Sequence, residues 1–224
     1  MSEDLRGVFA ALDAQPTRGD AGRTLMFVPV THAADATQAA QAAAFAAPQT
    51  PVFGIDLDLR HNALAQGFAK HHGLGVKMDG VLGGLSFCSA VGRDGRTVEG
   101  SERRFSYHRV GQSSVFVGAY DGRVLPLGAQ LELSFAGDYW SAACASGGTV
   151  VIAAPALSTN SVALRVAPHM HGVVLVVSGE TGAAPAARAA KAALTKAGAR
   201  VIGLIYADAS APVMALDRML RQAG

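Results

Sequence analysis

The sequence has little charge and no long basic run, and this shortage excludes one class of partner. Charged residues make up 16% of the 224 residues, and the formal net charge is +2. The longest basic cluster is Arg103-Arg104, followed by His108 and Arg109. It is too small to neutralise a run of nucleic-acid phosphates. We therefore expect no nucleic acid among the partners of this chain.

Cysteine is rare, and long apolar runs are absent. Cys88 and Cys144 lie in apolar stretches, which predicts buried free thiols of the kind found in a reducing compartment. No apolar run approaches the roughly 20 residues that cross a bilayer. Residues 1–12 are acidic and amphipathic, unlike a secretory signal. The sequence predicts a cytoplasmic protein with no direct membrane insertion, which would reach the inner face of the cell membrane through a partner.

Glycine and lysine are both missing from the stretch in which a phosphate loop would lie. Neither residue type occurs from Thr24 to Phe53, although a phosphate loop needs glycines for close backbone approach and a lysine to neutralise the phosphate. Ala36 takes the approximate lysine position, and Thr37 keeps a hydroxyl. Thr31 belongs to the same turn, and Asp35 would repel an anion at the helix start. The sequence predicts a degenerate phosphate loop.

What is present is an alternation of buried strands with helical stretches. This pattern predicts an α/β fold, with a mainly parallel central sheet and helices on both faces. We expect a single domain over 1–224, with an N-terminal helix at 1–14 and an irregular insert at 70–112 that holds short extra strands. The other predicted strands cover 24–30, 52–58, 113–120, 149–156, 172–179 and 200–207. The other predicted helices cover 36–47, 131–145 and 183–198, and a last one opens at Ser210 and Pro212.

Two carboxylates end the strand at 52–58, and parallel sheets bind ligands at such strand ends. Alternation along the strand puts Asp56 and Asp58 on the same face, where they could hold magnesium or activate a hydroxyl. Alternatively, they cap the following helix or pair with Arg60. The strand at 149–156 offers no carboxylate near Ala153, the position at which metal-dependent nucleotide enzymes carry an aspartate. The residues alone leave both roles of the aspartates open.

The remaining candidate sites are better explained by ordinary structure. His169 and His171 flank Met170 without a nearby cysteine or carboxylate, so the pair is not expected to bind metal. His71-His72 is interpreted as a solvated turn. The segment SGETG at 178–182 could hold an anion at a helix start, although a plain connecting loop is the simpler interpretation.

Several segments resemble one family almost from end to end. The chain is similar to the cytoplasmic bacterial tyrosine kinases of capsule and exopolysaccharide export, relatives of the MinD/ParA-like deviant-Walker ATPases. VFGIDLDLRHNALAQGF at 52–68 resembles their second Walker motif, in which Asp56, Asp58 and Arg60 match. EDLRGVFAAL at 3–12 resembles the N-terminal helix that mediates subunit contacts, in which Glu3 and Arg6 match. Further similar segments are MDGVLGGLS at 78–86, TVVIAAPA at 149–156 and the stretch 171–207.

The departures from this family all remove residues that the family uses for nucleotide binding or phosphorylation. The Walker A lysine, the Walker B aspartate and the base-contacting asparagine fall on or near Ala36, Ala153 and Ala207. The C-terminal tyrosine cluster of the family is missing. The resemblance therefore implies a P-loop NTPase-like three-layer fold with an emptied nucleotide site, and a chain that is expected neither to be an enzyme nor to hold a cofactor.

The resemblance also implies a role through binding. We expect a scaffold or regulator of exopolysaccharide or capsule biosynthesis and export, whose partner is a membrane polysaccharide copolymerase or a kinase paralogue, with a homo-oligomer as a further option. Glu3, Arg6 and Arg60 are the expected contact residues. The alternative is a divergent ATPase or tyrosine kinase that binds ATP and Mg²⁺ with Asp56 and Asp58 and a non-standard phosphate loop. A third interpretation is an unrelated Rossmann-like binder of a small ligand.

Overall fold

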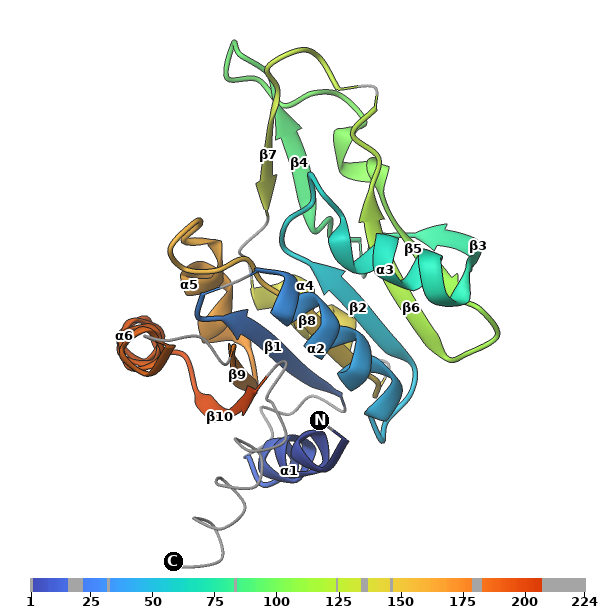
Figure 1. The fold of residues 1–224 in the computed structure, drawn as a ribbon. Helices are drawn as coiled ribbons and strands as arrows, with labels where there is room; N and C mark the ends of the chain where they lie inside the picture. The colour runs from blue at the N-terminus through green and yellow to red at the C-terminus, as the bar shows by residue number, and fades with distance from the viewer. Residues whose placement is uncertain are drawn as a thin grey trace, which may run out of the picture.

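The computed structural model describes residues 2–15, 22–31, 33–82, 84–123, 125–133, 137–145, 147–178 and 183–206. These residues form an α/β fold around one large sheet (Figure 1). The strands are β1 (Arg23–Pro29), β2 (Val52–Asp56), β3 (Leu74–Asp79), β4 (Cys88–Val91), β5 (Phe105–Val110), β6 (Val115–Tyr120), β7 (Gln130–Leu133), β8 (Thr149–Ala153), β9 (Gly172–Val177) and β10 (Val201–Tyr206). The helices are α1 (Ser2–Asp13), α2 (Ala33–Ala46), α3 (Ala63–His72), α4 (Gly137–Cys144), α5 (Val162–Val166) and α6 (Ala183–Lys196), with short 3₁₀ turns at Ser101–Arg104 and Ala167–His169.

The sheet has eight strands in the order β10-β9-β1-β8-β2-β6-β5-β3. The strands from β10 to β6 are all parallel, whereas β5 and β3 add an antiparallel edge. Strands β4 and β7 form a separate antiparallel ribbon, which rises above the large sheet in Figure 1. The mainly parallel sheet predicted from the sequence is therefore confirmed.

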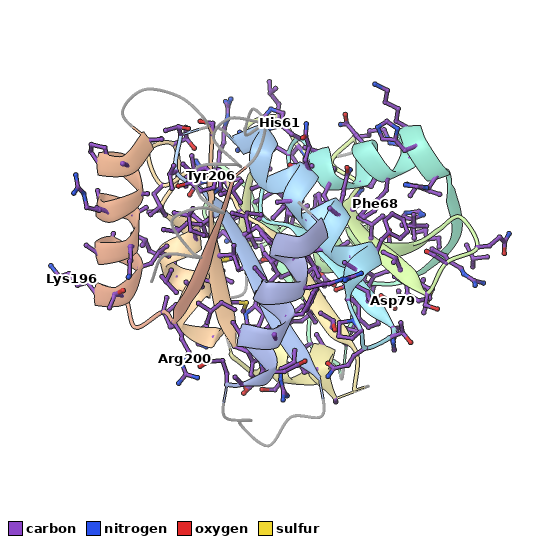
Figure 2. The ribbon with its side chains drawn as sticks, turned by 60° about the horizontal axis from the view of Figure 1, so that its bottom comes forward. His61, Phe68, Asp79, Lys196, Arg200 and Tyr206 are labelled. Carbon is purple, nitrogen blue, oxygen red and sulfur yellow. The ribbon has the colours of Figure 1, made fainter. Side chains whose placement is uncertain are left out.

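Helices cover both faces of the sheet because its central strands are apolar on both sides. Leu25 and Phe27 of β1 face the core that α1, α2 and α3 complete, while Met26 and Val28 face the core of α4, α5 and α6. Figure 2 shows α1, α2 and α3 in front of the sheet. This three-layer arrangement leaves the carboxyl ends of the parallel strands along one edge, where ligands of such sheets bind.

Two predictions about the middle of the chain were wrong in part. The predicted helix at 131–145 begins only at Gly137, because Gln130–Leu133 forms β7 and pairs with β4. Leu131 and Leu133 are half-buried while their polar neighbours are exposed, which is the two-residue period of a strand. The insert at 70–112 is also more regular than expected, since its strands β3 and β5 extend the main sheet.

Some predictions fall outside the described residues. These are the terminal helix at Ser210 and Pro212, the base-contacting position at Ala207, and residues 179–182 of the SGETG segment. Within the described ranges, no helix is long and apolar enough to cross a membrane. Both cysteines are buried and neither forms a disulfide, as predicted.

Candidate functional site

The turn between β1 and α2 is short and closed by contacts to β9. Three residues separate Pro29 from Ala33. The backbone N–H of Val30 donates to the carbonyl of Val176 at 2.9 Å, so pairing with β9 continues beyond the strand. The hydroxyls of Thr31 and Ser178 lie 2.9 Å apart and join the two strand ends. Val30 and Thr31, the described residues of this turn, are thus joined to the end of β9.

The position that would carry the phosphate-binding lysine lies inside the core. Ala36 is 0% exposed and belongs to the apolar cluster of α1, α2 and α3. Its side chain therefore packs within the protein and does not line an open cleft. Thr37, the next residue, is half-buried. The side chains of Asp35 and Glu3 lie outside the described residues.

Strand β8 brings no carboxylate to the carboxyl edge. Ala153 closes this strand and is 2% exposed. In the register of the sheet it lies between Phe27 of β1 and Asp56 of β2. The aspartate that comes closest to this position along the edge is therefore Asp56, contributed by the neighbouring strand.

Asp56 holds the start of helix α3. One carboxylate oxygen accepts the backbone N–H of Asp58 at 2.8 Å, and the other accepts the N–H of Leu64 at 3.1 Å. The residue is 4% exposed. Burial raises the pKa of this carboxyl from its ordinary 3.8 to about 6, although the same backbone N–H groups act in the opposite direction. Asp56 thus caps the helix that follows it, one of the two roles that the sequence left open.

Asp58 has a different environment, contrary to the expectation that both aspartates share a face. Strand β2 ends at Asp56, so the alternation of a strand no longer applies at Asp58. Asp58 is half-buried, and its Oδ2 lies 2.7 Å from Nδ1 of His61, which takes the place expected for Arg60. In Figure 2, His61 lies at the edge of the sheet where the parallel strands have their carboxyl ends.

A cleft with a volume of about 560 Å³ opens beside Asp58 at the carboxyl edge. Its walls come from the loop after β2, from β7 and from the loop between β8 and α5. Asp58, Arg60, Glu132, Ser161 and Arg165 are its main polar lining residues. Arg60 is exposed and makes no hydrogen bond or ion pair to the described residues. Of the two predicted catalytic carboxylates, Asp58 is the one that reaches a cleft.

A second groove, of about 710 Å³, lies beside the start of α3 and shares Arg60 with this cleft. Asn62, whose backbone is left-handed with φ 48°, lines this groove. Its amide donates to the carbonyl of Tyr120 at 2.9 Å, and its oxygen accepts the N–H of Tyr120 at 3.0 Å. This groove could not be predicted from the sequence, since it depends on strands far apart in the chain.

His71 and His72 are exposed, as expected, but they end helix α3 and do not form a turn. His171 has a structural explanation. His171 is 5% exposed, and its Nδ1 lies 3.2 Å from the backbone nitrogen of Thr24, which donates to it. The N–H of His171 donates to the Thr24 hydroxyl at 2.9 Å. The two residues thus join the starts of β1 and β9. Among the described residues, no group of three or more His, Cys, Asp and Glu could hold a metal ion.

The apolar side of helix α1 is buried against the rest of the same chain. Leu5, Val8 and Leu12 are at most 5% exposed and pack in the core of α2 and β10. Arg6 is exposed on the opposite side. A contact made by this helix with another molecule would therefore use its polar side.

The tyrosines lie mostly in the interior. Tyr107, Tyr120 and Tyr139 are at most 3% exposed, and the hydroxyls of Tyr107 and Tyr139 lie 3.0 Å apart. Burial raises the pKa of Tyr120 to about 12. Tyr206, at the end of β10, is half-buried. The sequence contains four tyrosines, so these positions account for all of them.

Comparisons with known proteins find the fold but no close relative in sequence. No protein-family model matches the chain, and no curated protein is significantly similar to it. The kinase domain of the Escherichia coli tyrosine kinase ETK is similar in structure, with a TM-score of 0.56 and 16% identity over 93% of this chain and 77% of the kinase domain.

Two further solved structures share the fold. The chimerical protein CapA2B2 has a TM-score of 0.51 and 14% identity, over 91% of this chain and 83% of its own. Cobyrinic acid a,c-diamide synthase from Mycobacterium smegmatis has a TM-score of 0.52 and 16% identity, over 90% and 80%. Identities this low establish the fold, not the activity. The chain therefore has the α/β fold of a bacterial tyrosine kinase domain, as its sequence motifs indicated, and it shares that fold with a diamide synthase.

Proposed function

We propose that this chain is a catalytically inactive, tyrosine-kinase-like protein that acts as a scaffold or regulator in exopolysaccharide or capsule biosynthesis and export. The fold of a tyrosine kinase domain supports the family. The proposed lack of catalysis rests on three side chains: Ala36 in α2, Ala153 at the end of β8 and Asp56 at the end of β2. The proposed mechanism is binding alone, so neither ATP nor Mg²⁺ is needed.

The buried side chain of Ala36 is the observation that carries this proposal. A phosphate site needs a cation that reaches out of the first helical turn, but this position points into the core with 0% exposure. The lost charge-assisted contact is worth several kcal/mol, on the order of 3. The dipole of α2 offers about 0.3–1 kcal/mol at an exposed terminus, rising to about 2 in favourable geometry. The helix start therefore does not replace the lysine.

The carboxyl edge supports the same conclusion. Ala153 cannot bind a metal ion, and both oxygens of Asp56 already accept backbone N–H groups. A carboxylate that holds magnesium must turn an oxygen toward the ion. Each Asp56 oxygen keeps a second lone pair, but the residue is 4% exposed and lines neither the cleft beside Asp58 nor the groove beside α3. Asp56 therefore stabilises the scaffold, and we expect it to take no part in catalysis.

The partner would be a membrane polysaccharide copolymerase or a kinase paralogue. The polar side of α1, which includes Arg6, and the exposed Arg60 are the proposed contact points. Because the apolar side of α1 is already buried, these contacts would be charged and sensitive to salt. The chain would then be held at the inner face of the membrane by its partner, and self-association through the same surfaces is a further option.

Calorimetry with Mg-ATP tests the absence of a nucleotide site. We expect no saturable heat up to about 1 mM nucleotide, which corresponds to a binding free energy weaker than about −4 kcal/mol. A tyrosine kinase domain with an intact phosphate loop serves as the positive control. Binding at micromolar strength would contradict the proposal.

Affinity capture from cells that produce the polysaccharide tests the partner. Recovery of an export copolymerase or a kinase paralogue with the wild-type chain, and its loss with Arg6→Glu or Arg60→Glu, is the expected result. Arg188→Glu is the matched control, because Arg188 is an exposed arginine on α6. If no component of the export machinery is recovered, the scaffold role is wrong.

The cleft beside Asp58 favours a second candidate function. Its volume of about 560 Å³ and its position at the carboxyl edge suit a small substrate, and Asp58 and Arg60 both line it. A divergent ATPase or tyrosine kinase would use these residues. Phosphate release from ATP that is lost in Asp58→Asn, with the fold unchanged, would favour this candidate over the scaffold.

A further inference from the structure

The groove beside the start of α3 gathers basic side chains from three separate elements. We name it the basic groove, and define it by Arg60 of the loop after β2, Lys77 of β3, and His108 of β5. Its volume is about 710 Å³, and its floor includes Ser106 and Ala119. It extends over the antiparallel edge of the sheet, away from the turn between β1 and α2.

Strand pairing brings two of the basic groups together. Lys77 of β3 lies directly opposite His108 of β5 in the antiparallel register, so their side chains leave the same face about 5 Å apart at Cβ. The hydroxyl of Ser106 lies 3.3 Å from Nε2 of His108 on that face. Lys77 is exposed and His108 is half-buried. A ligand on the floor would therefore meet both a cation and a hydrogen-bonding ring.

The acidic residue that lines the basic groove is already paired. Asp121 accepts hydrogen bonds from Nε and Nη2 of Arg123 at 2.9 and 2.8 Å, and these contacts lower the pKa of its carboxyl. Arg60 and Lys77 have no ion pair to the described residues. The lining of the groove is therefore net positive, although Asp79 lies on the same strand face as Lys77, opposite Ser106, and the whole chain is close to neutral.

We propose that the basic groove binds a phosphate monoester. Such a group carries about −1.5 to −2 charges near neutral pH and three acceptor oxygens, which suits a guanidinium, an ammonium and an imidazole that approach from different sides. A carboxylate carries only one charge and would neutralise less of the positive charge of the groove. The groove thus selects the phosphate by charge.

The apolar walls accommodate the organic part of the ester. Leu59, Leu125 and Leu131 line the basic groove together with Tyr120, and its volume lies in the range of sites that enclose small organic ligands. The phosphate could be carried by a sugar phosphate or by a phosphorylated tyrosine side chain, since both present the same group. This proposal does not depend on the proposed scaffold function.

Titration with two phosphate monoesters tests the site. Glucose 1-phosphate and O-phosphotyrosine are added to the full chain, and binding is followed by calorimetry and by shifts of backbone amide signals. Saturable binding with a Kd below about 1 mM is expected for at least one of them, with the largest shifts at Lys77, His108 and Ala119. Glucose and tyrosine, without the phosphate, should not bind. The preferred probe identifies the source of the phosphate.

Paired variants separate this site from general attraction to a positive surface. Lys77→Gln and Arg60→Gln should each weaken binding about tenfold, equal to about 1.4 kcal/mol. Lys191→Gln and Arg188→Gln on α6 remove the same charges from exposed positions outside the groove and should leave the affinity unchanged. Because all four side chains are exposed, circular dichroism should show the same fold throughout.

A lysine on an edge strand can also serve to prevent pairing with another chain, so the oligomeric state of Lys77→Gln is measured by light scattering. Aggregation of this variant with unchanged phosphate affinity would assign Lys77 to that protective role and overturn the site. Equal weakening in the groove and control variants, or no binding of either probe below 1 mM, would overturn it as well.

Discussion

Replacing Asp56 by asparagine tests whether this residue serves the fold or the chemistry. The carboxylate is 4% exposed and accepts the N–H groups of Asp58 and Leu64. Asparagine keeps the size and one acceptor oxygen, but it removes the ionisable group. The substitution therefore isolates the effect of a buried carboxyl on the pH dependence of stability.

The raised pKa of Asp56 determines whether the free energy of unfolding rises or falls with pH. Its carboxyl has a pKa of about 6 in the folded chain and an ordinary value of 3.8. Between these pH values the folded state holds a proton that the unfolded chain has released. The stabilisation is fully present below pH 3.8 and is lost as the pH rises through 6. A difference of about two pKa units corresponds to about 3 kcal/mol.

The assay compares urea unfolding of the wild type and Asp56→Asn at several pH values from 4 to 7.5. The free energy of unfolding of the wild type, relative to the variant, should fall by up to about 3 kcal/mol across this range. Asp13→Asn, an exposed carboxylate on α1, controls for the loss of one charge. The slope m should stay constant, so that the two-state treatment holds.

A relative stability that does not change with pH, or that rises between pH 4 and 7, would refute the reasoning. Either result would mean that the backbone N–H groups, a cation or solvent outweigh the effect of burial on Asp56. The argument from burial would then fail, whereas a rise with pH would still be compatible with capping of α3.

Three further substitutions test other contacts by chemical or thermal unfolding. Ala36→Lys should destabilise the fold by more than about 3 kcal/mol, because it buries a charge, and calorimetry should show no gain of Mg-ATP binding. Asn62→Ala should cost about 2 kcal/mol, because it leaves the backbone groups of Tyr120 unpaired. Gly148→Ala should lower the melting temperature by several degrees, about 4 or more, because its Cβ would collide with the carbonyl of Pro51.

Each of these expectations has a result that would contradict it. Mg-ATP binding by Ala36→Lys would mean that the helix start faces an open site. An Asn62→Ala variant as stable as the wild type would mean that water satisfies Tyr120 in its place. An unchanged melting temperature of Gly148→Ala would mean that the loop before β8 lies farther from Pro51.

The fold could be predicted because the central strands are buried on both faces. Their sequences contain continuous apolar runs, such as residues 25–29 of β1 and Gly172–Val177 of β9, which a parallel sheet requires. The alternation with helices then specified the α/β class. The segment at 131–145 could not be divided into a strand and a helix from its sequence. Over so short a stretch, two half-buried leucines and the aromatic pair Tyr139 and Trp140 fit either element.

The candidate site was predictable only in part. Motif spacing located Ala36 along the chain but not the face on which it lies. Buried positions in α2 follow the helical period at Ala36, Ala39, Ala40 and Ala43, yet nine of the 14 residues of the helix are alanine, so hydrophobicity gives little contrast between its faces. The basic groove could not be predicted at all. The neighbourhood of Lys77 and His108 depends on a register that shifts between Leu74 and Lys77.

The enclosed tyrosines limit how this molecule can take part in signalling. A modifying enzyme needs the phenol oxygen of its target in an extended, accessible segment. Here Tyr107, Tyr120 and Tyr139 would each have to leave the core first, and Tyr206 is held in a strand. The folded chain is thus a poor acceptor of phosphate on tyrosine. In such signalling, this chain would recognise phosphotyrosine on other molecules and would not carry it.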